Sequence, residues 1–141
     1  MLLEPSGIGD PAYSQNMPRQ PESARTARHL TASALHVWGL DEAADSAAAV
    51  VTELVSNAVR HARRDTVQVK VTRAGDRLVR IAVTDFSRDL PEPRHAAMDA
   101  VTGRGLAIVA ALCDGRWGAD PLRWGKTVWA ELAVPEAKPD E

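Results

Sequence analysis

The sequence of 141 residues contains one cysteine, Cys113, and no hydrophobic run that approaches the roughly 20 residues of a membrane-spanning helix. A single cysteine cannot form an internal disulfide, which favours a reducing compartment. No basic segment followed by a long apolar stretch, the pattern of a signal peptide, is visible. We therefore expect a cytoplasmic protein whose fold depends neither on disulfides nor on a membrane.

An excess of charge of either sign is also missing, because 17 Lys and Arg residues stand against 19 Asp and Glu residues. A net charge of -2 does not support a general attraction to nucleic acid or to an anionic membrane, and we expect neither partner. The chain is 45% hydrophobic and 26% charged, a composition typical of one globular domain that buries its own core.

Several well-defined chemical motifs do not occur. The sequence holds no Cys/His cluster with zinc-binding spacing and no nucleophile signature of a Ser-His-Asp hydrolase. It also lacks the P-loop pattern and the third glycine of the dinucleotide fingerprint. A function must therefore come from other residues.

The N-terminal 21 residues contain four prolines and two glycines, which predicts a loose arm with at most one short strand around 13–17. Residues 22–134 are expected to form the globular domain. The polar residues 135–141 are expected to form a tail.

Two helices are predicted at the start of the domain from apolar residues at helical spacing. The first covers 24–38, with Ser23 as its N-cap and Gly39 at its end. The second runs from 42 to about 62. Its predicted core face consists of Ala47, Val51, Leu54, Val55, Ala58 and Ala62.

The period then changes from 3.6 to 2. Alternating apolar residues over 67–71 and 79–83, with Gly75-Asp76 between them, predict an antiparallel hairpin that ends at Asp85. Residues 86–102 show no period, and a structureless stretch of that length in a small domain is usually functional.

The last part of the domain is predicted to contain a short helix and two strands. The helix covers 106–112. The strands cover 116–119 and 127–134 and are expected to join across Asp120-Pro121.

Glu53, Asn57 and His61 lie four residues apart and form one stripe along the second predicted helix, beside its apolar face. An amide oxygen is a hard ligand suited to Mg²⁺ beside phosphates, and a glutamate can accept a proton from an attacking hydroxyl. Taken alone, the stripe is more typical of a solvated helix face.

Asp85 closes an apolar strand, where its carboxylate could accept a hydrogen bond from an exocyclic amine such as that of adenine. The alternative is a turn or cap aspartate. Gly103-Arg104-Gly105-Leu106 leads into a helix whose first N–H groups could bind an anion, although glycines also serve simply to end a loop. Thr127 could bind a ligand or merely begin a strand.

The order of these motifs resembles that of the GHKL ATPase superfamily. The segment from Glu53 to Ala62, Glu-Leu-Val-Ser-Asn-Ala-Val-Arg-His-Ala, closely resembles its N box, and the His-Ala ending is most similar to the anti-sigma-factor serine kinases and their small actinobacterial relatives. Asp85, Gly103-Arg-Gly-Leu106 and Gly125-Lys-Thr127 follow in the order of the remaining motifs. The resemblance covers roughly residues 20–134.

This resemblance implies an α+β fold, a two-layer sandwich in which a mixed, mostly antiparallel sheet carries helices on one face. It also implies that ATP binds with Mg²⁺ held by Asn57, that Glu53 is the general base, and that residues 86–102 form a lid. The nucleotide-contacting residues that it implies are Asn57, His61, Asp85, Ser87, Gly103, Arg104, Gly105, Leu106 and Thr127. Among them, Asp85 would read the adenine amine and Thr127 would lie near the adenine through water.

Two functions stay open at this stage. The first is a regulatory kinase that phosphorylates a serine or threonine of an antagonist protein and binds a sigma factor, with a homodimer as a further option. The second is a non-catalytic ATP-binding module that controls partner docking. The second gains weight because the usual Asp-x-Gly-x-Gly box reads Asp85-Phe-Ser87-Arg-Asp89 here, without either glycine.

Overall fold

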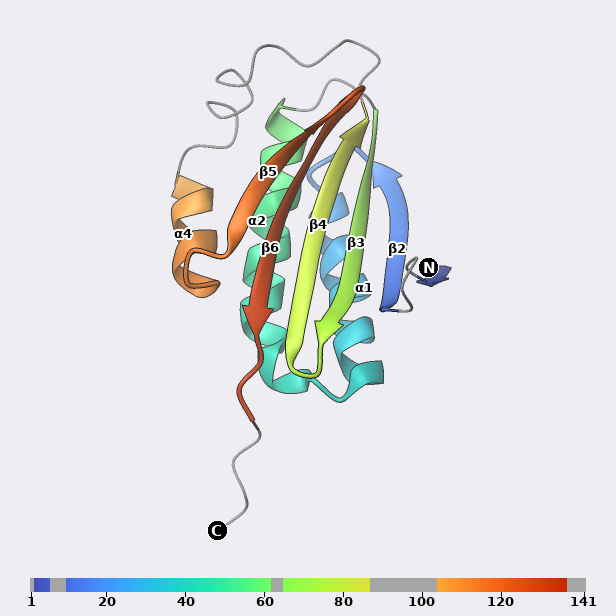
Figure 1. Cartoon of the computed structure of the whole chain (residues 1–141). Helices are drawn as coiled ribbons and strands as arrows, with labels where there is room; N and C mark the ends of the chain where they lie inside the picture. The colour runs from blue at the N-terminus through green and yellow to red at the C-terminus, as the bar shows by residue number, and fades with distance from the viewer. Residues whose placement is uncertain (1, 6–9, 62–64, 87–103, 137–141) are drawn as a thin grey trace.

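The computed structural model describes residues 2–5, 10–61, 65–86 and 104–136, which form one sheet with helices packed on one of its faces (Figure 1). The strands are β1 (Leu2–Pro5), β2 (Pro11–Pro18), β3 (Thr66–Gly75), β4 (Leu78–Phe86), β5 (Trp117–Leu122) and β6 (Gly125–Ala133). The helices are α1 (Ser23–Trp38), the 3₁₀ turn η1 (Asp41–Ala43), α2 (Ala44–His61) and α4 (Arg104–Leu112).

The six strands are ordered β1-β2-β3-β4-β6-β5. All pairings between the described strands are antiparallel, in line with the expected mixed, mostly antiparallel sheet. The predicted α+β sandwich with helices on one face is confirmed.

The core lies between the sheet and the helices, as the two periodicities predict. Alternate residues of the central strands are fully buried, namely Val67, Val69 and Val71 of β3 and Val79 and Ile81 of β4. The predicted apolar face of α2 is buried from Ala47 to Ala58, whereas Ala62 lies outside the described residues. Gly39 ends α1 with a φ of 70°, the left-handed conformation that favours glycine.

The N-terminal segment differs from the loose arm that its prolines predict. Residues 11–18 form β2, which pairs with β3 from Ala12 to Pro18, and the short strand expected at 13–17 is thus part of a longer one. Met17 is buried in the core, and Pro11 and Pro18 stand at the strand ends, where a missing N–H disrupts little pairing. Ser23 does not cap α1. It begins the helix, and its hydroxyl donates to the Pro18 carbonyl at 2.5 Å.

The C-terminal hairpin turns later than expected. Asp120 and Pro121 belong to β5 and pair with β6, so the connection predicted at these residues is wrong. The two residues between the strands are Arg123 and Trp124. A proline is tolerated in β5 because this is an edge strand of the sheet.

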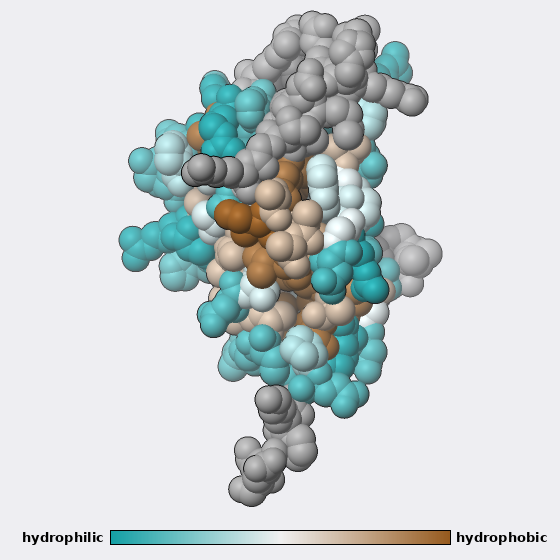
Figure 2. Space-filling view, turned by 90° about the vertical axis from the view of Figure 1, so that its left-hand side faces the viewer, coloured by the Kyte–Doolittle hydropathy of each residue, from teal (hydrophilic) through white to brown (hydrophobic). Residues whose placement is uncertain are grey.

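Helix α4 has an apolar side that is exposed on the surface. The face of the molecule that carries this helix shows a gathering of hydrophobic residues (Figure 2). Ile108 is 46% exposed and Leu112 is 37% exposed, and Ala107 and Ala111 are exposed beside them. None of the described helices is long and apolar enough to cross a membrane.

Candidate functional site

The start of α4 lies directly against the polar stripe of α2. A Cβ atom added to Gly105 would come within 2.5 Å of the Glu53 Oε2 atom and 3.7 Å of the Glu53 Cβ atom. Only a residue without a side chain allows this approach while the Glu53 carboxylate keeps its place. Two motifs that are 52 positions apart in the chain are therefore neighbours in space.

Asn57 lies one turn beyond Glu53 and is only 4% exposed. Its Nδ2 atom is buried and has no hydrogen-bond partner among the described residues. A buried polar group without a partner costs about 1–3 kcal/mol, so this amide calls for a specific explanation. A ligand with acceptor oxygens, such as a phosphate, would satisfy it.

The Asn57 amide oxygen is better suited to bind Mg²⁺ than to bind a metal ion that is coordinated by protein side chains alone. The described residues contain no group of three or more His, Cys, Asp or Glu side chains that could hold a metal ion. Mg²⁺ commonly takes one or two protein oxygens and completes its shell with water and phosphate. The single Asn57 amide oxygen fits that mode of binding.

Asp85 lies at the other side of the site, near the end of β4. Asp85 is 6% exposed and stands directly opposite Lys126 of β6 in the strand register. Asp85 shares its face with Ile81 and Val83, and Lys126 shares its face with the buried Val128. Because side chains alternate along a strand, Asp85 and Lys126 both point toward the helices.

Lys126 is half-buried beside Asp85. Burial lowers the pKa of the Lys126 ammonium, and the nearby Asp85 carboxylate opposes part of that shift. Burial also lowers the pKa of His61, at the end of α2, and the positive charges of Lys126 and Arg60 lower it further. The last turn of α2 and the start of β6 therefore share one electrostatic environment.

Thr127 does not join this group. It pairs with Thr84, and the two hydroxyl oxygens lie 2.8 Å apart on the face of the sheet opposite to the helices. The structure thus separates Thr127 from Asp85, contrary to the expected position beside the adenine. Because side chains alternate along a strand, Lys126 lies on the same face as Asp85 instead. Aligning β6 with β4 so that the buried Val83 and Val128 face each other would have identified Lys126.

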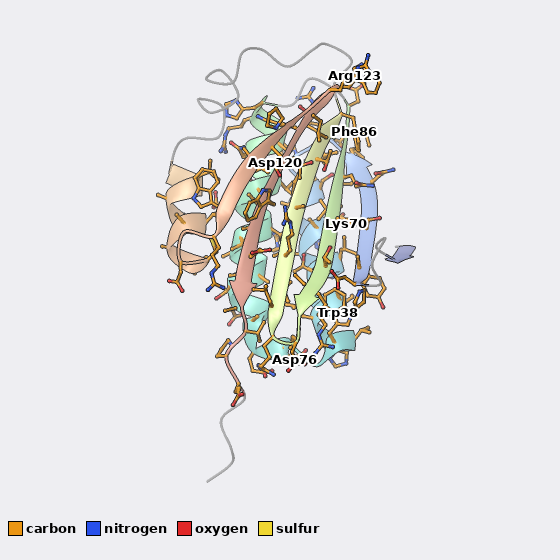
Figure 3. All side chains as sticks on the ribbon, viewed as in Figure 1. Trp38, Lys70, Asp76, Phe86, Asp120 and Arg123 are labelled. Carbon is orange, nitrogen blue, oxygen red and sulfur yellow. The ribbon has the colours of Figure 1, made fainter. Side chains whose placement is uncertain are left out.

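The remaining predicted residues fall into two groups. Leu106 is 5% exposed and packs in the core at the start of α4, and Arg104 is the first residue of that helix. Ser87, Gly103 and the predicted lid beyond Phe86 lie outside the described residues. Phe86 and Arg123 mark the end of the sheet at which Asp85 is found, far from the β3–β4 turn at Asp76 (Figure 3).

The fold and this arrangement define a class of protein. The protein is an α+β sandwich with a buried amide, a buried carboxylate and a glutamate packed against a glycine. These groups lie between the helices and one end of the sheet, and such a site is suited to bind a nucleotide. The family model of the histidine kinase-like ATPase domain matches residues 17–116, which is 100 of the 141 residues. The chain belongs to this family, within the GHKL superfamily, and is an ATP-binding module.

Proposed function

We propose that this protein is a regulatory ATP-dependent kinase that phosphorylates a serine or threonine of an antagonist protein, in the manner of the anti-sigma-factor kinases that its N box resembles. One observation carries the proposal. Glu53 and the buried Asn57 occupy successive turns of α2, and Gly105 at the start of α4 packs against the Glu53 carboxylate.

Each end of the site has a role in holding the nucleotide. The buried Asp85 carboxylate accepts a hydrogen bond from the adenine amine. The first backbone N–H groups of α4 have no partners within the helix and would face the phosphates, since negative charge is favoured at a helix N-terminus. Asn57 would hold Mg²⁺ through its amide oxygen and would donate from Nδ2 to a phosphate oxygen. A metal ion held there would supply positive charge that neutralises the phosphates.

The transfer step uses Glu53 as the base. The partner's hydroxyl oxygen bonds to the γ-phosphorus while the bond from that phosphorus to the bridging oxygen of ADP breaks. The hydroxyl proton passes to the Glu53 carboxylate, which later releases it to water. The products are ADP and a phosphorylated serine or threonine.

A second candidate is a module that binds ATP without transferring phosphate and uses it to control docking of a sigma factor, an antagonist or a second copy of the chain. The observation that favours it is the replacement of both first-box glycines by Ser87 and Asp89. Side chains there change the backbone conformations available next to the phosphates.

Two measurements test the proposal. The unfolding temperature is recorded with ATP, ADP and GTP, each with and without Mg²⁺, and we expect ATP with Mg²⁺ to raise it most and GTP least. Guanine presents a carbonyl where adenine presents an amine, and it would leave the Asp85 carboxylate opposite an acceptor. Equal stabilisation by GTP would reject the role of Asp85.

The second measurement uses ATP labelled at the γ-phosphate with candidate antagonist proteins. Label in a serine or threonine of the antagonist supports the kinase. ATP binding without any label in the candidates favours the docking module.

A further inference from the structure

We infer that Lys126 is a specificity residue that donates a hydrogen bond to N1 of the adenine ring. Together with Asp85 it would form an acceptor–donor pair that reads two adjacent atoms of the base edge. This inference rests on the proposed binding of ATP, with its adenine at Asp85.

The position of Lys126 is set by the pairing of two central strands. Asp85 and Lys126 are directly opposite each other in the antiparallel β4–β6 pair. Directly opposite residues lie on the same face of a sheet, with Cβ atoms about 4.5–5.5 Å apart. The buried Val83 and Val128 form the next pair on this face, so Lys126 lies at the edge of the core on the face that carries Asp85.

The surroundings of Lys126 suit a ligand contact. Lysine is seldom withdrawn from water without a partner, yet this side chain is half-buried at the core edge. The ionisable groups near Lys126 are the Asp85 carboxylate, which stands opposite it in the β4–β6 pair and raises its pKa, and His61 of α2, whose pKa the Lys126 charge lowers. An ammonium carries three donors, and one carboxylate does not engage them all.

The pair matches adenine and mismatches guanine. The adenine edge presents the N6 amine, which donates, next to N1, which accepts. A carboxylate beside an ammonium offers the complementary order. Guanine presents O6, which accepts, next to N1–H, which donates, so in the same pose each group would face its own kind. A second reading group makes base selection stricter than Asp85 alone could.

The test compares ATP with two analogues by titration calorimetry on the full chain. In 1-deaza-ATP a C–H replaces N1, and in 7-deaza-ATP a C–H replaces N7. We expect the parent protein to bind 7-deaza-ATP like ATP and to bind 1-deaza-ATP about tenfold to hundredfold more weakly, which is the loss of a charge-assisted hydrogen bond. Lys126→Met should bind ATP and 1-deaza-ATP with equal affinity.

Lys70→Met is the matched control. Lys70 belongs to the same sheet and pairs with Ala82, but its side chain lies on the face away from the helices. It should keep the parent's preference for ATP over 1-deaza-ATP. Equal binding of the two nucleotides by the parent would overturn the inference while leaving ATP binding intact, and this comparison needs no variant to fold. Discrimination that persists in Lys126→Met would also overturn it. A parent that binds none of the three nucleotides would reject the proposed function as well.

Discussion

The two faces of the sheet carry different chemistry at the same end of the molecule. Asp85 and Lys126 face the helices, whereas Thr84 and Thr127, each one residue away, face the other side and share a hydrogen bond of 2.8 Å. A step of one residue along a strand therefore decides whether a side chain reaches the site. Motif spacing alone does not contain that information, but strand pairing does.

The contrast continues along the strands. The face away from the helices has partly exposed cross-strand contacts, with the Arg80 guanidinium 4.3 Å from the centre of the Trp129 ring and 3.6 Å from the Glu131 carboxylate. Such surface pairs stabilise a fold by at most about 1 kcal/mol each. The helix-facing side instead buries charged and amide groups at a cost, which makes it the side where a ligand has most to contribute.

The largest difference between the faces should appear in phosphotransfer. Glu53→Gln removes the proposed base, and we expect the rate of transfer to an antagonist to fall by about 10²–10⁴-fold with near-normal ATP binding. Glu131→Gln, the same change on the opposite face, should leave the rate unaltered. Single-turnover labelling measures both rates, and an unchanged rate in Glu53→Gln would remove this residue from the mechanism.

A smaller effect is expected at Gly125, whose backbone contacts the backbone of Asp85 between the two faces of the sheet. Gly125 has a φ of 151°, and a Cβ atom there would lie 1.8 Å from the Asp85 carbonyl oxygen. Gly125→Ala should therefore lower the free energy of unfolding by more than about 2 kcal/mol, through strain and displacement of the β4–β6 pair.

The control for this change is Gly115→Ala. Gly115 has a φ of 77° but no atom within 4 Å of an added Cβ, so only the backbone conformation is penalised. We expect a loss of about 1 kcal/mol in urea denaturation. Equal destabilisation by the two changes would show that the contact with Asp85 is not tight.

A third prediction concerns Asn57 of α2, which lies on the side of the sheet that the helices cover. Asn57→Ala removes an amide whose Nδ2 has no partner among the described residues and improves helix propensity by up to about 0.7 kcal/mol. We expect the apo protein to keep its stability and Mg²⁺-dependent ATP affinity to fall by about tenfold or more. Titration with and without Mg²⁺ measures this, with Ser56→Ala as the neighbouring control. If Asn57→Ala and Ser56→Ala bind ATP with Mg²⁺ equally well, the Glu53/Asn57 stripe has only a structural role.

The smallest effect is expected for Thr127. Thr127→Val removes the hydrogen bond to Thr84 and should cost about 0.5–1.5 kcal/mol of stability. Nucleotide affinity should stay within about twofold of the parent, since the hydroxyl lies on the far face. Loss of ATP binding in this variant, with its fold intact, would restore Thr127 to the site and weaken the case for Lys126.

The parts predicted well from sequence are those governed by a long, uniform period. The α2 stripe follows from 3.6-residue spacing over 18 residues, and Asp85 follows from alternation in β4. The errors occur where tertiary pairing overrides a local signal. Prolines indicated a loose arm at 11–18 and a turn at Asp120-Pro121, yet strand ends and sheet edges accept them. The face of Thr127 depended on register with a strand some 40 residues earlier.

The two glycines at the site would behave differently in a library of variants scored separately for protein abundance and for nucleotide binding. At Gly125 a new side chain would clash with the rigid backbone of Asp85, so substitutions should destabilise the protein and lower its abundance in the cell. At Gly105 a new side chain meets the end of the flexible Glu53 side chain, which can move aside. Substitutions there should leave abundance intact while displacing the carboxylate, so a screen for expression alone would score Gly105 as tolerant.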